Sequence, residues 1–382
     1  MVRSILHMDL DTFFVSCERL LDSRLNGKPI LIGGTSDRGV VASCSYEARL
    51  YGIHSAMPMK MAKERCPEAI VIKGNGSTYS KYSHLVTEII KENAPVFEKA
   101  SIDEFYMDFT GMDRFFGNLK YASELRQKII KETGLPISFG LSENKTVSKI
   151  ATGEAKPNNQ LSIHYGEEKA FLAPLSVKKI PMVGLKTYQT LCNLGIKKIQ
   201  TIQEMPIELM ENVLGVNGIG IWKKANGIDH AVVEAYSEKK SISTEHTFER
   251  DTTDVHLLHS LLSSMCEKLT FQLRKTNKLT ACVTLKIRYS DFQTQTLQKQ
   301  IPYTATDHEL LPIIQELFTR LYQRRVMIRL IGIRFSTLVS GHHQLRLFDQ
   351  QTSYTDLYQA MDRIRKRFGE QYIMRAASIY KK

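Results

Sequence analysis

Short apolar runs alternate with amphipathic stretches between residues 5 and 154, and this alternation limits the possible folds more than any other feature of the sequence. The runs typical of strands are Ile5 to Asp11, Ile30 to Ile32, Val40 to Cys44, Val96 to Ile102, Phe105 to Phe109 and Ile137 to Leu141. Helical stretches follow Asp11 and lie near residues 46–51, 57–66, 79–93, 118–133 and 144–154. Such alternation predicts an α+β core.

The rest of the chain has a different organisation, and 382 residues exceed what one compact core holds. Short helices broken by glycines are expected over residues 165–236, followed by a charged linker at 237–240. Residues 241–340 predict the order β-α-β-β-α-β, which suits a small sheet with two helices on one face. An amphipathic helix is expected near residues 354–368, so the sequence predicts several domains.

The distribution of charge indicates the kind of partner. The formal net charge is +12; residues 241–340 hold 13 Lys/Arg against 9 Asp/Glu, and residues 341–382 hold 8 against 4. This surplus in the C-terminal third favours a polyanion partner, although a solvated basic surface is the alternative. Six scattered cysteines indicate free thiols, and no apolar run reaches membrane-spanning length. A cytoplasmic protein that does not enter a membrane is expected.

Three acids lie where predicted elements end. Asp9 closes the first apolar run, and Asp103 and Glu104 lie at the turn of the hairpin predicted for residues 96–109. A turn lets neighbouring acids face one site, whereas in a continuous strand they point to opposite faces. Carboxylates brought together repel one another unless cations neutralise them, and hard oxygen ligands select Mg²⁺ or Mn²⁺. These acids are candidates for holding two ions, although acids at strand ends are most often only solvated.

Four blocks of sequence surround these acids: Met8 to Phe14, Ala42 to Arg49, Ser101 to Glu104 and Ile150 to Asn158. In order and spacing they resemble the signature blocks of the Y-family DNA polymerases, and their details are most similar to the bacterial members. The resemblance extends over residues 1–340. It implies an α+β right hand with a palm (1–11 and 76–164), fingers (12–75), a helical thumb (165–236), a little finger (241–340) and a tail (341–382).

The resemblance implies a role for each matching acid. Asp9 and Asp103 resemble the metal-bridging aspartates of the family, and Glu104 resembles its third catalytic carboxylate. The backbone carbonyl of Leu10 would complete the shell of one ion. Asp11 or Thr12 is expected to cap the helix that follows, and Asp11, which matches no ligand of the family, is interpreted as such a cap.

The same blocks imply a nucleotide site. Tyr46, Arg49 and Lys156 resemble the residues that grip the incoming triphosphate, with Ser43 as a weaker addition. Arg49 offers a planar fork for phosphate oxygens, and Lys156 offers a compact charge. Phe14 resembles the steric gate that excludes a ribose 2′-hydroxyl; the alternative is a core phenylalanine on an amphipathic helix.

Contacts with DNA are expected in the thumb and the little finger. Glycine turns at residues 181–186 and 215–220 resemble helix-hairpin-helix elements, with Gly184, Gly218 and Gly220 meeting DNA phosphates through their backbone. Met182 stands where a glycine is usual, which puts the first contact in doubt if that turn needs a positive φ. Candidate backbone contacts in the little finger are Lys275, Lys278, Arg288, Arg325, Arg329 and Arg334, although such positions can equally be ordinary solvent-facing ones.

A short motif in the tail implies a protein partner. Gln344, Leu345, Leu347 and Phe348 resemble the pentapeptide that bacterial polymerases insert into the sliding clamp. One polar anchor and three apolar side chains on a loop suit a groove, while packing against its own domain is the alternative.

These features favour a low-fidelity DNA polymerase that adds deoxynucleoside triphosphates to primer-template DNA, copies damaged bases and acts as a monomer recruited by the clamp. A nucleotidyl cyclase is one rival, because palm-like folds with paired acids also make cyclic nucleotides. A DNA- and clamp-binding scaffold with a degenerate palm is the other. The phosphate-binding loop of ATPases is absent from the sequence, so no ATPase activity is expected.

Overall fold

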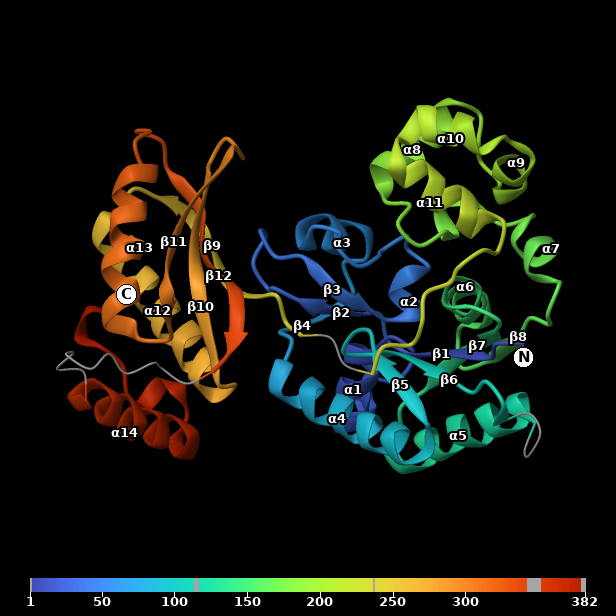
Figure 1. The fold of residues 1–382 in the computed structure, drawn as a ribbon, viewed down its shortest axis with the longest axis horizontal. Coiled ribbons are helices and arrows are strands. Elements are labelled where there is room, and N and C mark those ends of the chain that lie inside the picture. The colour runs from blue at the N-terminus through green and yellow to red at the C-terminus, as the bar shows by residue number, and fades with distance from the viewer. Residues whose placement is uncertain (1, 113–116, 236–237, 342–351, 379–382) are drawn as a thin grey trace. The chain divides into compact units, whose positions relative to one another are not determined.

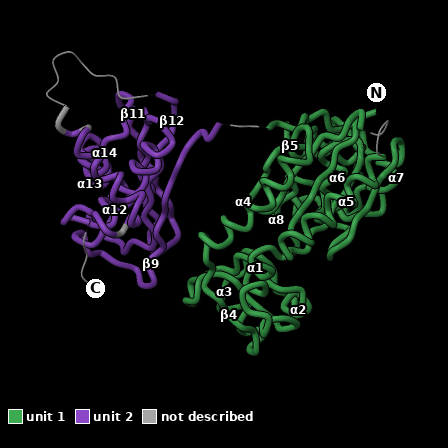
Figure 2. The backbone as a smooth tube through the Cα atoms, turned by 90° about the horizontal axis from the view of Figure 1, so that it is seen from below, with its two compact units in different colours: residues 1–237 green, residues 238–382 purple. Residues whose placement is uncertain are grey.

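The computed structural model describes residues 2–112, 117–235, 238–341 and 352–378, which form two compact units (Figures 1 and 2). One unit is Met1–Ser237 and the other is Glu238–Lys382. Helices and sheets occur in both, so the predicted α+β class is confirmed. No helix in the described part of the chain is both long enough and apolar enough to cross a membrane.

A five-stranded sheet forms the centre of the first unit, in the order β5-β6-β1-β7-β8. Its strands are β1 (Ile5–Leu10), β5 (Val96–Lys99), β6 (Glu104–Asp108), β7 (Ile137–Ser142) and β8 (Gln160–Ser162). β1 pairs antiparallel with both β6 and β7, and β7 pairs parallel with β8. β1 is therefore the central strand, and its side chains are buried on both faces.

Helices cover both faces of this sheet (Figure 1). α1 (Phe13–Leu21), α4 (Gly76–Asn93) and α5 (Asn118–Thr133) share a core with Leu6, Met8 and Leu10 of β1. The opposite face receives α6 (Lys145–Ala155), where the Thr152 hydroxyl lies 2.8 Å from His7 Nδ1. Because side chains alternate along a strand, Asp9 lies on the same face as His7, the α6 face.

A second, smaller sheet is inserted between α1 and α4, with strand order β3-β2-β4. It consists of β2 (Ile30–Gly33), β3 (Val41–Cys44) and β4 (Ile70–Ile72), with α2 (Tyr46–Arg49) and α3 (Met59–Arg65). β4 is a strand that the sequence pattern missed, as is β8 in the large sheet. Both are only three residues long, which is too short for an alternation to be recognised.

Short helices make up the remainder of the first unit, as the glycine punctuation predicts. They are α7 (Glu168–Leu172), α8 (Leu185–Asn193), α9 (Ile199–Glu204), α10 (Ile207–Leu214) and α11 (Val216–Ala225). Their buried side chains form one core with Val147, Ile150 and Ala151 of α6. Because Thr152 of α6 also contacts His7 of β1, α6 connects this helical region to the sheet.

The second unit has the predicted order β-α-β-β-α-β. Its elements are β9 (Ser241–Thr252), α12 (Val255–Lys275), β10 (Lys278–Tyr289), β11 (Thr294–Thr304), α13 (Asp307–Leu321) and β12 (Ile328–Ser340). The four strands form an antiparallel sheet in the order β11-β10-β12-β9, and both helices pack on one face (Figure 1). The pattern is recoverable from sequence because the strands are long and alternate regularly.

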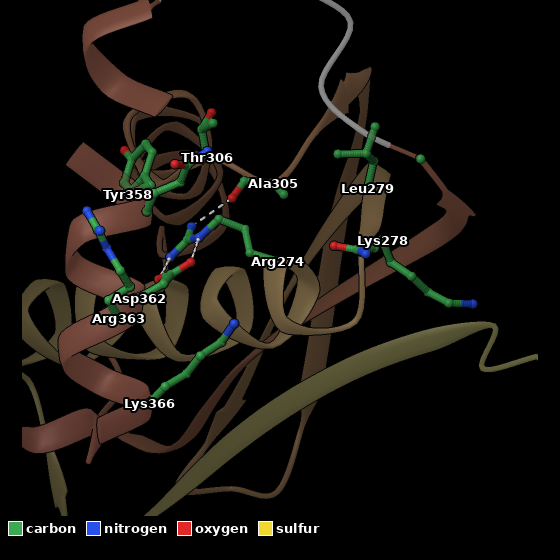
Figure 3. A pocket seen from close by; sticks show the side chains of 12 residues that line it. Arg274, Lys278, Leu279, Ala305, Thr306, Tyr358, Asp362, Arg363 and Lys366 are labelled. Carbon is green, nitrogen blue, oxygen red and sulfur yellow. Dashed lines mark hydrogen bonds and ion pairs between the residues drawn. The ribbon is translucent and has the colours of Figure 1, made fainter. Parts of the chain in front are cut away.

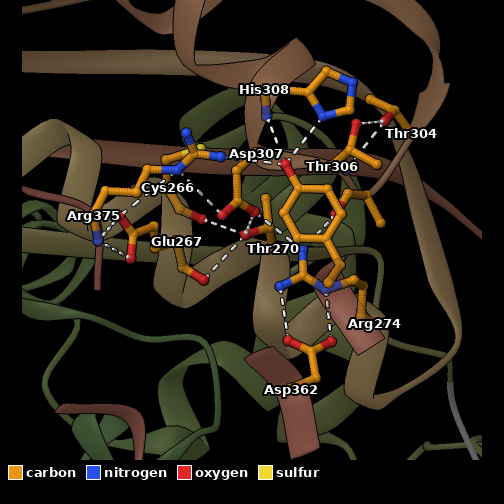
Figure 4. A network of polar contacts seen from close by, with 12 residues as sticks. Cys266, Glu267, Thr270, Arg274, Thr304, Thr306, Asp307, His308, Asp362 and Arg375 are labelled. Atoms are coloured by element: carbon orange, nitrogen blue, oxygen red, sulfur yellow. Dashed lines mark hydrogen bonds and ion pairs between the residues drawn. The ribbon is translucent and has the colours of Figure 1, made fainter. Parts of the chain in front are cut away.

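The tail adds a third helix, α14 (Thr352–Phe368), which is held to α12 by buried charges (Figure 4). Arg365 donates to Glu267 Oε2 at 2.8 Å, and both side chains are at least 95% buried. The Ser378 hydroxyl donates to the other carboxylate oxygen of Glu267 at 2.7 Å. Arg274 forms a two-bond pair with Asp362 of α14, at 2.7 and 3.0 Å. The tail is therefore an integral part of this unit.

Two local predictions differ from the structure. The hairpin turn occupies residues 100–103, and Glu104 is already the first residue of β6, because the Ala100 and Ser101 N–H groups both donate to the Glu104 carbonyl. Asp11 is not a helix cap: the cap position of α1 is Thr12, at φ 43°, with no side-chain cap bond. All six cysteines are free, as expected.

Candidate active site

The register of two neighbouring strands brings two of the predicted acids together. Asp9 of β1 is directly opposite Glu104 of β6. Paired residues of antiparallel strands project to the same face, with Cβ atoms about 4.5–5.5 Å apart. Both carboxylates therefore lie on the α6 face of the sheet, although 94 residues separate them in the sequence.

The turn before β6 adds the third acid. The Leu10 N–H donates to the Asp103 carbonyl at 3.0 Å, which fixes the turn against the end of β1. Ser101 organises the turn, because its hydroxyl donates to Asp103 Oδ1 at 2.6 Å and accepts the N–H of Glu104 at 3.0 Å. Asp9, Leu10 and Asp103 line one cavity of about 150 Å³.

Two lysines of the α6 region hold the acids. Lys156, the C-cap residue of α6, donates to Asp9 Oδ1. Lys149, on α6 itself, donates to both carboxylate oxygens of Glu104 at 2.7 and 2.8 Å. Seven residues, or about two helical turns, separate the lysines, so both lie on one side of the helix.

The electrostatics of this face favour a cation. Burial raises the pKa of the Asp9 carboxyl to about 7; Glu104 and Asp103 add to the rise, and Lys156 opposes it. A carboxylate in this position gains from any positive charge placed near it. In residues 2–112, 117–235, 238–341 and 352–378, no three His, Cys, Asp or Glu side chains are close enough to hold a metal ion. Lys156, Lys149 and Ser101 each donate to one of the three acids.

Four of the five residues expected at the nucleotide line the same cavity. Phe14 from α1, Ser43 from β3, Arg49 from α2 and Lys156 border it together with Asp9 and Asp103, whereas Tyr46 and Glu104 do not. Tyr46 is one helical turn before Arg49, and the guanidinium lies 4.9 Å from the centre of its ring. Burial raises the pKa of the Tyr46 hydroxyl above its usual value. Polar and cationic groups from three elements thus converge on one opening.

The two aromatic residues of the first block have different surroundings. Phe13 is buried in the core. Phe14 is only partly buried, borders the cavity, and stacks on Tyr79 of α4 with ring centres 4.4 Å apart. The Tyr79 hydroxyl donates to Glu18 at 2.6 Å, which fixes the supporting ring. Phe13 also borders the cavity, but Phe14 is the more exposed of the two rings.

Sequence reasoning missed the role of Asp11. Its buried carboxylate accepts the Ser138 hydroxyl at 2.7 Å and the Asn158 N–H at 2.6 Å, and its other oxygen lies 3.7 Å from Lys156 Nζ. It therefore anchors the loop that carries Lys156. Only the pairing of β1 with β7 brings Ser138 to it, so no local signal could have revealed this.

Other cavity-lining residues were also missed, namely Thr12, Phe13, Ala42 and Ser55. Lys149 was missed too, although the sequence held a signal. It precedes Lys156 by seven residues, a spacing that places both on one side of a helix.

One of the three thumb glycines, Gly218, has a packing role in addition to any contact with DNA. A side chain at Gly218 would meet the Met210 carbonyl at 1.9 Å, so this glycine allows α11 to approach α10. The Gly184 N–H already donates to the Met182 carbonyl, at 3.1 Å. Gly220 has open space at its Cβ position. Met182 has φ 82°, so the first turn does need the positive φ that a glycine would supply. The DNA contacts of these turns stay predictions.

The six basic candidates of the second unit do not form one cluster. Arg288 and Arg334 lie on the face of the sheet away from the helices, where Lys286 joins them. Lys275 and Lys278 flank the turn from α12 to β10, at one end of the sheet. Arg325 and Arg329 lie around the start of β12, at the other end. The period-two alternation of β10 could have revealed Lys286.

A larger cavity of about 410 Å³ lies between α14 and the turn from α12 to β10 (Figure 3). Arg274, Asp362 and Lys366 line it, and Arg274 is already paired with Asp362. None of the expected catalytic acids or triphosphate-gripping residues borders this cavity. We therefore assign the candidate active site to the smaller cavity, which acids and cations line together. The predicted clamp-binding residues, Gln344, Leu345, Leu347 and Phe348, lie outside the described residues.

Comparison with known proteins identifies the family. Residues 8–153 match the impB/mucB/samB family, and residues 239–347 match the C-terminal domain of that family. A DNA polymerase IV of Dehalococcoides mccartyi is 38% identical over 372 residues, covering 96% of this chain and 95% of the relative. The chain belongs to the Y family of DNA polymerases. A DNA polymerase IV of Treponema denticola is 33% identical and covers 94% of the chain and 90% of the relative.

Solved Y-family structures have the same fold. A Y-family DNA polymerase chimera of Dbh and Dpo4 aligns with a TM-score of 0.79 at 26% identity, covering 88% of this chain and 100% of the chimera. DinB from Sulfolobus solfataricus aligns with a TM-score of 0.62 at 25% identity, with the same coverage. The right-hand fold and the resemblance to bacterial DNA polymerase IV are confirmed. This member of the Y family is a DNA-directed DNA polymerase.

Proposed function

We propose that this Y-family polymerase adds deoxynucleotides to the 3′ end of a primer, copies damaged template bases, and does so with low fidelity. The observation that carries the proposal is the shared cavity at the end of β1. It combines two acids, Asp9 and Asp103, with the cations Arg49 and Lys156 and the ring of Phe14. Acids for metal ions and cations for phosphates within one opening suit nucleotidyl transfer.

Asp9, Asp103 and Glu104, with the Leu10 backbone carbonyl, would hold two divalent ions. These oxygen donors fit Mg²⁺, and Mn²⁺ can substitute for it. When bound, two such ions lower the pKa of the primer hydroxyl and stabilise the leaving pyrophosphate. The protein supplies the fixed geometry, because the β1–β6 register and the Ser101 turn set the positions of the acids.

The incoming nucleotide would be gripped by residues from both sheets. Lys156 and Arg49 would neutralise the triphosphate, and the hydroxyl groups of Tyr46 and Ser43 would donate hydrogen bonds to its oxygens. Phe14 would lie under the sugar and exclude a 2′-hydroxyl. The stack on Tyr79 gives that ring a rigid support.

DNA binding would be divided among domains with the expected boundaries: palm 1–11 and 76–164, fingers 12–75, thumb 165–236 and little finger 241–340. A small fingers domain gives little check on the shape of the nascent base pair, which accounts for the tolerance of damaged bases. The thumb turns and the basic residues of the little finger would contact phosphates without reading sequence. We also propose a cytoplasmic monomer that is recruited by the sliding clamp through residues 344–348.

Primer extension with the purified protein tests the proposal. Template-dependent addition of deoxynucleotides with Mg²⁺ is expected, and Asp103→Ala should abolish it. Asp108→Ala is the matched control, because Asp108 ends β6, the strand that follows Asp103, but it accepts the Thr110 N–H and does not line the cavity. A product formed without a template would indicate a cyclase. DNA binding without any extension would indicate a scaffold.

A further inference from the structure

α6 places an ammonium group on Glu104, one of the three acids proposed to hold metal ions. Lys149 Nζ lies 2.8 Å from Oε1 and 2.7 Å from Oε2 of Glu104. The Lys149 side chain is 36% exposed and that of Glu104 is 23% exposed, so the pair is partly shielded from water. Among the described residues, Glu104 is the hydrogen-bonding and ion-pairing partner that the geometry gives Lys149.

A second pair on the same helix shows what a purely structural lysine looks like. Lys145, one turn earlier, donates to both oxygens of Glu98 at 2.7 and 2.8 Å. It also donates to the Val232 carbonyl, and its ammonium lies 4.7 Å from the centre of the Tyr106 ring. Lys145 thus ties several segments together, and its partner Glu98 is not one of the acids proposed to hold metal ions. The two lysines have the same pairing geometry and different surroundings.

We propose that Lys149 is a positioning residue that occupies Glu104 until a divalent ion arrives and must leave the carboxylate before Glu104 can serve as a ligand. This inference rests on the proposed metal site. Two ammonium groups, from Lys149 and Lys156, balance two of the three carboxylate charges in the protein without metal. The mutual repulsion of the acids at the sheet edge is thereby reduced.

The replacement of Lys149 by a divalent ion at Glu104 affects the order in which the ion and the nucleotide bind. A divalent ion binding alone must displace an ammonium group from Glu104 and bind close to another cation, which weakens its affinity. A nucleotide removes part of this penalty, because its triphosphate offers Lys156 a new anionic partner in place of Asp9. Ion binding and nucleotide binding are therefore coupled, and the protein holds divalent ions weakly until the nucleotide is present.

Binding of Mn²⁺ to the full chain, without DNA or nucleotide, tests the proposal; free Mn²⁺ is measured by electron paramagnetic resonance. Lys149→Met removes the competing charge and should bind Mn²⁺ about tenfold more tightly than the unmodified protein. Lys149→Arg retains the charge and should stay close to the unmodified protein. Lys145→Met, the matched control, should leave the affinity unchanged.

Thermal unfolding supplies a second readout. Without metal, Lys149→Met leaves the acids less balanced, so its Tm should fall and then rise on addition of Mg²⁺ by more than that of the unmodified protein. Lys145→Met should lose stability that Mg²⁺ does not restore, because its pair is remote from the ion site. Circular dichroism at low temperature checks that each variant is folded.

Two outcomes would overturn the inference: unchanged Mn²⁺ affinity in Lys149→Met, or an equal gain in Lys145→Met. Weaker binding of primer-template DNA with unchanged Mn²⁺ affinity would make Lys149 a DNA contact instead. Failure of the proposed metal site is distinguishable. It would appear as no Mn²⁺ binding by the unmodified protein even with DNA and nucleotide, or as binding that survives Asp103→Ala.

Discussion

Phe14 is proposed as the steric gate because of the residues that surround it. Its ring borders the cavity while Tyr79 supports it from behind, so removing the ring opens space where a sugar would lie. Phe14→Ala should raise the use of ribonucleotides relative to deoxynucleotides by about one to two orders of magnitude, because a lost steric contact no longer penalises the 2′-hydroxyl.

Single-nucleotide insertion with each sugar measures this ratio. Tyr79→Phe is the control, since it keeps the supporting ring and removes only the hydroxyl that binds Glu18. If Phe14→Ala and the unmodified enzyme discriminate equally, Phe14 is not the gate.

Glu143 supplies a pH-dependent prediction away from the active site. Burial raises the pKa of its carboxyl, and the neighbouring Glu168 raises it further. The charged form therefore costs more free energy in the folded protein than in the unfolded chain. Glu143→Gln removes this cost, so its Tm should exceed that of the unmodified protein at pH 8. The gain should fade as the pH approaches 4.5, where the carboxyl of the unfolded chain also becomes protonated.

Thermal denaturation between pH 4.5 and 8 measures the effect. Glu132→Gln, an exposed position on α5, should leave Tm unchanged across the range. A gain that stays constant with pH would show that the charge on Glu143 is not its source.

At the scale of elements, α14 is attached to the second unit through charge. Arg365 and Glu267 are both buried, and breaking such a pair leaves an uncompensated charge in the interior. Arg365→Ala should therefore destabilise the second unit by about 3–5 kcal/mol. Arg363→Ala, an exposed position on the same helix, should cost little.

Hydrogen exchange of the α12 amides in the full chain measures this loss of stability in the second unit. The double variant Glu267→Leu, Arg365→Met should recover part of it, because apolar side chains remove the unpaired charge. Equal protection of α12 in Arg365→Ala and in the unmodified protein would mean that the tail is not part of the fold of this unit.

The whole molecule carries a net charge of +12, and its basic candidates lie on an open sheet face and at both ends of that sheet. Affinity for primer-template DNA should therefore fall steeply as salt concentration rises. Each phosphate contact that is removed should lower the slope of log affinity against log salt by about one.

The double variant Arg288→Ala, Arg334→Ala tests the open face and should lower that slope by about two. Arg24→Ala is the control, since Arg24 pairs with Asp22 in the first unit. Fluorescence anisotropy with a labelled duplex measures the salt dependence of DNA affinity in the double variant and in the control. An unchanged slope in the double variant would exclude the open face as the DNA contact.

Local patterns in the sequence determined much of this protein: the α+β class, the six elements of the second unit, the tail helix, and the blocks that resemble the Y family. These features depend on periodicity and on residues close together in the chain, so they are visible without coordinates. The acids and the phosphate-gripping residues could be named as candidates for one site because each lies within such a block, and their roles stay predictions.

Only the tertiary structure decided which partner each of these residues has. The β1–β6 register places Asp9 beside Glu104, the β1–β7 pairing gives Asp11 to Ser138 and Asn158, and α6 brings Lys149 to Glu104. The physical reason is that these contacts join segments far apart in the chain. Strand register and helix placement are set by the packing of the whole core, which no local window of sequence contains.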